Sequence, residues 1–112
     1  MVNFGTDPSW PFDPELDELE KLSNGVIDLI ERGHLDRAER LCLELKRRFP
    51  ETIDWIERTA ALHEARGQAG QAIDHDQLCI DFIERDPDEF DADIKDWYRS
   101  EIDRLRRPRR PA

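Results

Sequence analysis

One stretch decides the fold of this chain: Gly33-His34-Leu35-Asp36-Arg37-Ala38, continued by an amphipathic segment to Phe49-Pro50. Glycine readily takes the left-handed conformation that ends a helix, and proline stops the next helix because it lacks a backbone N–H. Between them, apolar residues recur at the three- and four-residue spacing of one helix face: Leu35, Ala38, Leu41, Cys42, Leu45 and Phe49. The stretch therefore predicts a turn followed by a helix over residues 35–48.

The strongest features of this stretch return at a fixed offset. Gly67 lies 34 residues after Gly33, and Ala72 lies 34 residues after Ala38. Apolar periodicity and helix-ending residues predict five helices, over residues 14–32, 35–48, 52–66, 69–85 and 87–107. Because few β-branched residues fall in alternating runs, we expect no sheet and an all-α fold.

The ends of the chain differ from this helical domain, which we place at residues 14–107. An irregular lead, residues 1–13, contains Phe4, Trp10 and Phe12. These aromatic side chains either pack on the first helices or form a docking segment for a partner, since exposed aromatic residues tend to be covered. A basic tail rich in proline and arginine occupies residues 108–112.

Two Asp-Pro pairs predict where helices begin. Asp13-Pro14 and Asp86-Pro87 each combine an oxygen that can cap the first amides with a proline at a position that needs no amide. We therefore expect the fifth helix to start at residue 87 and to lie over the fourth helix as a cap. The wide apolar face of the fourth helix should be covered on two sides.

The segment from Gly33 to Pro50 resembles the second half of a tetratricopeptide repeat. Four positions of that motif match, and the second unit matches at three, although its proline comes late, at Pro87 instead of Glu84. The matching residues are Gly33, Leu35, Ala38 and Pro50, then Gly67, Ala69 and Ala72, with Leu22, Ile56 and Ala60 fitting in the first helices. The resemblance covers about residues 19–107 and implies an α-solenoid of antiparallel helix hairpins, about two and a half repeats long. A generic five-helix bundle is the alternative.

The resemblance also implies a concave groove, lined by the first helix of each pair, that accepts an extended peptide or a helix. Mapped onto this chain, the groove is acidic with an apolar floor. Its residues are Glu20, Ser23, Ile27, Glu31, Asp54, Glu57, Ala61 and Glu64, with Asp88, Asp91 and Tyr98 added from the last helix. No cluster of Lys, Arg and Asn marks a carboxylate clamp, so a basic or amphipathic ligand is expected. The alternative is a solvated acidic face that serves solubility alone.

The net charge of −10 agrees with such a partner and disfavours nucleic acid. Five arginines within residues 104–112 are the exception. They can pair with the acidic groove of the same chain or of a neighbouring copy, and they give only a weak case for nucleic acid or anionic lipid. We expect a protein-binding module that acts as an adaptor, a chaperone-like protein or an inhibitor. A structural module that forms a homodimer is the second hypothesis.

Other chemistry finds little support in the sequence. Cys42 and Cys79 fit the apolar stripes as buried free thiols, which favours a reducing, cytoplasmic location. Early acidic residues argue against a secretory leader, and no apolar run is long enough to span a membrane.

His75 and Cys79 have metal-ligand spacing, but two ligands are not a site, and His63 falls on a buried stripe. The acidic residues 86–93 lack the glycine and closing glutamate of a calcium loop. With no phosphate loop or nucleophile motif, we expect no cofactor and no enzymatic activity, and an enzyme or metal protein is the third hypothesis.

Overall fold

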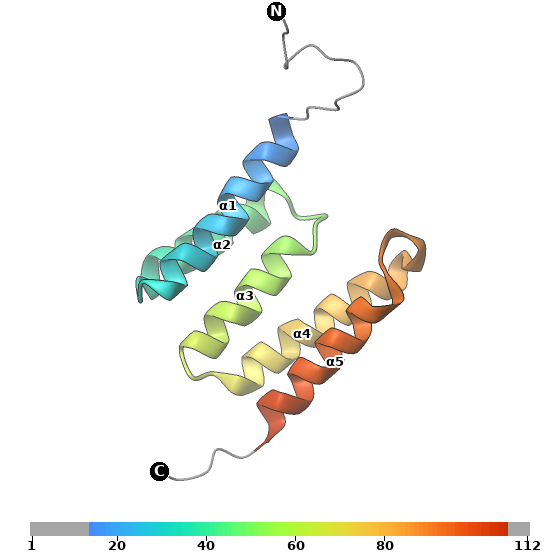
Figure 1. The fold of residues 1–112 in the computed structure, drawn as a ribbon. Coiled ribbons are helices and arrows are strands. Elements are labelled where there is room, and N and C mark those ends of the chain that lie inside the picture. Colours follow the sequence, from blue (N-terminus) through green and yellow to red (C-terminus); the bar gives the residue numbers. More distant parts are fainter. Residues whose placement is uncertain (1–13, 108–112) are drawn as a thin grey trace, which may run out of the picture.

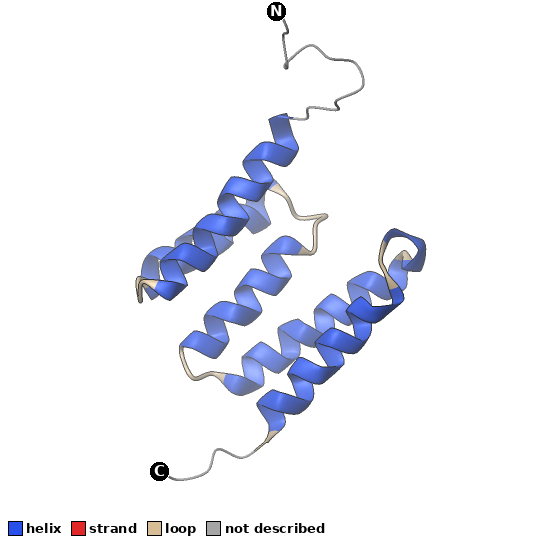
Figure 2. Cartoon of the chain, viewed as in Figure 1, coloured by secondary structure: helices blue, strands red, loops and turns tan. Residues whose placement is uncertain are grey.

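The computed structural model describes residues 14–107, and this part of the chain is all-helical. Figure 2 shows its helices joined by short loops, with no strand in residues 14–107. The elements are α1 (Pro14–Glu31), α2 (Leu35–Arg48), α3 (Asp54–Ala65), α4 (Ala69–Arg85), a 3-10 turn η2 (Pro87–Glu89) and α5 (Ala92–Arg106). The all-α prediction is confirmed. The lead and the tail lie outside the described residues.

The helices pack mainly on their neighbours in sequence. Consecutive helices run in opposite directions, and α3 lies between the α1–α2 pair and the α4–α5 pair (Figure 1). α1 also contacts α3, and α4 is covered by α3 on one side and α5 on the other, as its wide apolar face predicts. No described helix has the combined length and apolarity that crossing a bilayer requires.

The two repeated glycines make the same turn. Gly33 and Gly67 have φ of 79° and 74°, in the left-handed region where a side chain would be strained. After each, the next N–H donates back to a helix carbonyl, His34 to Leu29 and Gln68 to His63, both at 2.8 Å. Each glycine N–H also donates to a helix carbonyl, Gly33 to Ile30 and Gly67 to Glu64. This pair of hydrogen bonds is the Schellman motif, which satisfies carbonyls at the ends of α1 and α3. The 34-residue offset in the sequence is thus an identical helix-ending geometry in space.

The prediction that the last helix starts at residue 87 is wrong. Asp86-Pro87 begins only the 3-10 turn, and the Asp86 side chain makes no capping hydrogen bond. Phe90 then takes an extended conformation, and its ring packs against Phe82 with centroids 6.0 Å apart. Because Phe90 packs in this extended conformation, the backbone is not helical there, and α5 begins five residues later than predicted, at Ala92.

The two cysteines are free and buried, as their positions in the stripes predict. Burial raises the pKa of Cys42 to about 11, and burial also raises the pKa of Cys79. Both side chains are therefore protonated thiols that act as small apolar core residues at neutral pH.

Candidate partner-binding surface

Three residues of α3 line a hollow between α3, α4 and α5. Glu57, Ala61 and Glu64 follow each other at spacings of four and three residues, which places them on one helix face. The hollow has a volume of about 220 Å³. We call it the Asp76 hollow, and it is lined by Glu57, Arg58, Ala60, Ala61, Glu64, Asp76, Trp97 and Glu101. Three predicted groove residues are thus brought together.

Asp76 of α4 is the buried acid among the residues that line this hollow. It is 6% exposed, in a helix face otherwise formed by apolar residues such as Ala72 and Ile80. Burial raises the pKa of Asp76 from 3.8 to about 6, and the negative charges of Glu101, Glu64 and Glu57 add to the effect, while the positive charge of Arg104 partly offsets it. A buried charge that faces three like charges is costly, so its position calls for a compensating cation.

Trp97 of α5 stands at the side of the Asp76 hollow and is 52% exposed. Its ring packs edge-on against the Tyr98 ring, with centroids 5.0 Å apart. A second hollow of about 260 Å³ shares Glu57 and Trp97 and adds Ile94 and Tyr98. The two hollows therefore meet at Trp97, with carboxylates concentrated in the first and apolar side chains in the second.

Two arginines hold the acidic side chains in place. Arg58 donates from Nε to Ser23 Oγ of α1 at 2.9 Å, and its Nη1 lies 3.5 Å from Glu57 Oε1. Arg104 of α5 donates from Nη2 to Glu64 Oε1 at 2.6 Å and to Glu101 Oε1 at 2.8 Å. Both guanidinium groups are thus bound to partners other than Asp76, and the four carboxyl groups of the hollow outnumber them two to one.

Tyr98 and Ser23 differ from the groove prediction because both are buried. The Tyr98 hydroxyl donates to Glu57 Oε2 at 2.8 Å, and burial raises the pKa of Tyr98, so the hydroxyl stays protonated. Ser23 accepts the hydrogen bond from Arg58. Tyr98 thus positions Glu57 and lines the second hollow with little exposed surface, whereas Ser23 positions Arg58.

The remaining predicted residues lie away from the Asp76 hollow. Glu20 and Glu31 are exposed on α1, and Ile27 is half-buried there. Asp88 and Asp91 are exposed in and beside the 3-10 turn. The structure does not bring these residues into the same hollow as the α3 glutamates.

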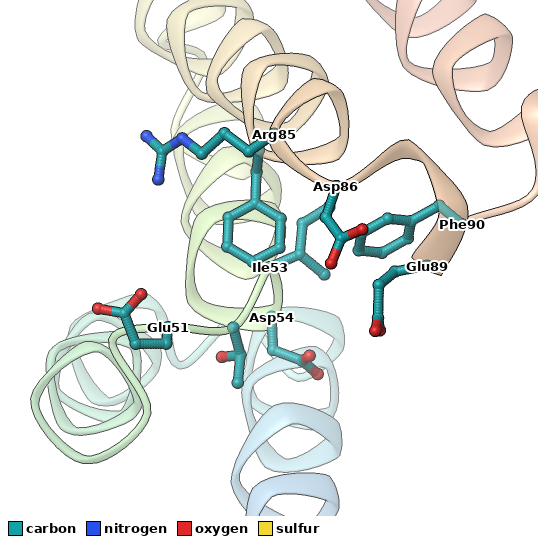
Figure 3. A pocket seen from close by; sticks show the side chains of 9 residues that line it. Glu51, Ile53, Asp54, Arg85, Asp86, Glu89 and Phe90 are labelled. Carbon is teal, nitrogen blue, oxygen red and sulfur yellow. The ribbon is translucent and has the colours of Figure 1, made fainter.

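Asp54 lines a separate, open hollow of about 410 Å³ where α3 begins and α4 ends. Figure 3 shows the carboxylates of Glu51, Asp54, Asp86 and Glu89 arranged around Ile53 and Phe90, with Arg85 extending away from them. All four carboxylates belong to residues that are exposed or half-buried, and water can solvate them. This hollow repeats the acidic and apolar character of the first without a buried charge.

Sequence reasoning missed Asp76, Trp97 and Glu101, and only Asp76 carried a usable signal. It lies four residues after Ala72, three before Cys79 and four before Ile80, so it occupies the apolar stripe of its helix. A charged residue in a stripe that should be buried is unusual and points to a site. Trp97 is 52% exposed although Ile94 and Tyr98 on either side of it pack in the second core cluster.

Metal-ligating residues do not converge in the described chain. Within residues 14–107, no three His, Cys, Asp or Glu side chains are grouped so that they could hold a metal ion. Cys79 is buried in the core, whereas His75 packs beside His63 with ring centroids 5.0 Å apart. The carboxylates of the Asp76 hollow are therefore arranged around a space larger than a metal ion.

Comparison of the chain with protein-family models, with curated proteins and with solved structures finds no match.

Proposed function

We propose that this chain is a protein–protein interaction module that binds a basic or amphipathic segment of a partner protein. In this role it acts as an adaptor, a chaperone-like protein or an inhibitor. The observation that carries the proposal is the Asp76 hollow, which is lined by four carboxyl groups and by a half-exposed tryptophan. Tryptophan is a frequent anchor of protein interfaces, and carboxylates recruit basic side chains.

The neighbouring hollow extends this argument to an amphipathic ligand. A basic residue in the Asp76 hollow would place the next residues of its segment beside Trp97 and Ile94. Apolar side chains at those positions would cover surface that is otherwise exposed to water. The ligand chemistry favoured by the two hollows is thus a basic residue followed or preceded by an apolar one.

We also propose that the helices form a tetratricopeptide-like array, with α1, α3 and α5 on the side that binds the partner. Support comes from the identical turns at Gly33 and Gly67 and from packing mainly between sequence neighbours. The two buried free thiols favour a reducing compartment and hence the cytoplasm.

The test uses short synthetic peptides that share apolar positions and carry Lys, Gln or Glu at the remaining ones. Titration calorimetry should detect binding of the Lys peptide only, with an affinity that falls as salt is added. Amide chemical shifts should change along α3 and α5. The proposal is wrong if the Gln peptide binds equally well or if the shifts cluster elsewhere.

A matched pair of variants locates the surface. Trp97→Ala should weaken binding of the Lys peptide by at least about tenfold, as expected for an interface anchor. Leu43→Ala removes another exposed apolar side chain, on α2, and should leave the affinity unchanged. The molecular mass should be measured over a range of concentrations alongside, because a dimer that masks Trp97 would indicate the self-association role instead.

A further inference from the structure

Asp76 has no cation of its own. The positive charge of Arg104 of α5 acts on Asp76, but this arginine donates its hydrogen bonds to Glu64 and Glu101. Arg58 of α3 donates to Ser23 and Glu57. Among the described residues, no side chain forms a hydrogen bond or ion pair with Asp76. A buried carboxylate in this state is unusual, because burying a charge without a partner is costly.

The Asp76 carboxylate still faces open space. No fully buried side-chain oxygen or nitrogen in residues 14–107 lacks a hydrogen-bond partner. Since Asp76 has no such partner, its oxygens must keep contact with the hollow that it lines. The carboxylate therefore opens into the Asp76 hollow.

The size of the hollow limits what can enter. Its volume of about 220 Å³ lies below the roughly 300–1,000 Å³ of sites for drug-sized molecules. The carboxylates are not close enough to hold a metal ion. A single cationic side chain is small enough for this volume and does not require the carboxylates to be as close together as metal ligands. Such a side chain needs a recessed anion for its charge and an apolar wall along its stem.

We propose that the Asp76 hollow is a recognition pocket for the cationic end of one lysine or arginine side chain of a bound segment. The ammonium or guanidinium group lies at the Asp76 carboxylate, and the aliphatic stem lies along Trp97. The half-exposed Trp97 ring adds apolar contact with that stem. This inference rests on the proposed function, because the side chain belongs to the partner segment.

The pocket couples binding to protonation. Asp76 has a pKa of about 6, so at that pH half of the free protein carries a proton on this group. A bound cation favours the ionised carboxylate, and binding must therefore release a proton near pH 6. Several other charged or titratable groups face Asp76 from the helices around it: Glu57, Arg58 and Glu64 of α3, Glu101 and Arg104 of α5, and the Cys79 thiol of α4.

The experiment uses neutral synthetic peptides that carry one central Lys, Arg or Gln, together with the Lys-rich peptide of the previous test. Affinity of the single-Lys peptide should rise about tenfold between about pH 5 and pH 7, following the ionised fraction of a group with pKa near 6. Calorimetry in buffers of different ionisation enthalpy should show proton release. Comparison of the Lys and Arg peptides determines which cation the pocket prefers.

Asp76→Asn is the decisive variant, and Asp74→Asn is its matched control on the same helix, where Asp74 is exposed. Asp76→Asn should lose at least about tenfold in affinity at pH 7 and should lose the pH dependence, whereas Asp74→Asn should keep both. Circular dichroism checks that each variant is folded.

The possible failures are distinct. If the Lys-rich peptide binds wild type and Asp76→Asn equally, the pocket assignment is overturned while the proposed function stands. A pH dependence that survives in Asp76→Asn also overturns it, because another carboxylate then titrates. If the Lys-rich peptide binds neither protein, the proposed function itself is wrong.

Discussion

At the scale of single residues, the ionised carboxylate of Asp76 lowers the stability of the fold. Burial and the charges of Glu101, Glu64 and Glu57 raise the pKa of Asp76 from 3.8 to about 6. The folded state thus binds the proton more tightly than the unfolded chain does. Below about pH 4 the carboxyl is neutral in both states and costs nothing, and above about pH 6 the full cost of its ionisation is present.

Replacing Asp76 with asparagine should remove this cost. Two pKa units of difference correspond to about 3 kcal/mol, so Asp76→Asn should raise the free energy of unfolding by up to about that amount at pH 7.5. The gain should vanish near pH 4. Urea unfolding of both proteins at the two pH values measures it, and an equal difference at both would show that the ionised carboxylate is not the cause. A variant that is more stable but binds less well is typical of a functional site.

The turn glycines make a second residue-scale prediction. Nothing lies within 4 Å of a Cβ added at Gly33 or Gly67, so their only obstacle to a side chain is the positive φ. Gly33→Ala and Gly67→Ala should each destabilise the protein by about 1 kcal/mol, since a left-handed alanine is strained.

Gly70 is the control for these variants. It lies in α4, its φ is not positive and its added Cβ also meets open space. Gly70→Ala should stabilise the protein by up to about 1 kcal/mol because alanine is the better helix former. Thermal or urea unfolding reports the sign, and a loss of stability in all three variants would point to crowding instead of backbone strain.

At the scale of helices, the sequence predicts most element bounds because the signals are local. Residues 35–48 and 69–85 coincide with α2 and α4, since glycine turns and apolar periodicity act within a few residues. The start of α5 was not predictable in this way. It depends on Phe90 packing against Phe82, a contact between side chains of two separate elements.

The residues of the candidate site likewise fall into those predictable from local spacing and those that depend on contacts between helices. Glu57, Ala61 and Glu64 share one face of α3, so helical spacing brings them together without knowledge of the fold. Trp97 and Glu101 join them only through the way α5 lies along α4 and opposite α3. The α1 residues were placed beside them by resemblance alone, and Ser23 proved to be a buried partner of Arg58.

Substitution of two leucines of α2, one on each face of the helix, tests its amphipathic character. Leu45 is fully buried and Leu43 is 61% exposed, only two positions away. Leu45→Ala should lower the free energy of unfolding by about 2–5 kcal/mol through lost contacts and a cavity. Leu43→Ala should change it by less than about 0.5 kcal/mol. Similar losses in denaturant unfolding of the two variants would mean that something covers the outer face of α2 in solution.

At the scale of the whole molecule, the core consists of two clusters that meet at α3. One centres on residues of α1 and α2 together with Leu62, and the other on residues of α3, α4 and α5, while Trp55 packs against both. The α1–α2 pair and the α4–α5 pair do not share a cluster. Any coupling between the stabilities of the two pairs must therefore pass through contacts with α3. An array of this kind can open locally at one end, as repeat proteins do.

Native-state hydrogen exchange of two core variants tests this division. Ile102→Ala weakens the second cluster and should speed amide exchange in α4 and α5 while α1 and α2 remain protected. Leu45→Ala weakens the first cluster and should have the opposite distribution, with α3 responding to both. A uniform increase along the whole chain in each variant would instead show that α3 couples the clusters into one cooperative unit. If the two clusters open independently, binding at the Asp76 hollow should stabilise α3–α5 selectively, because a ligand stabilises only the elements that unfold together with its site.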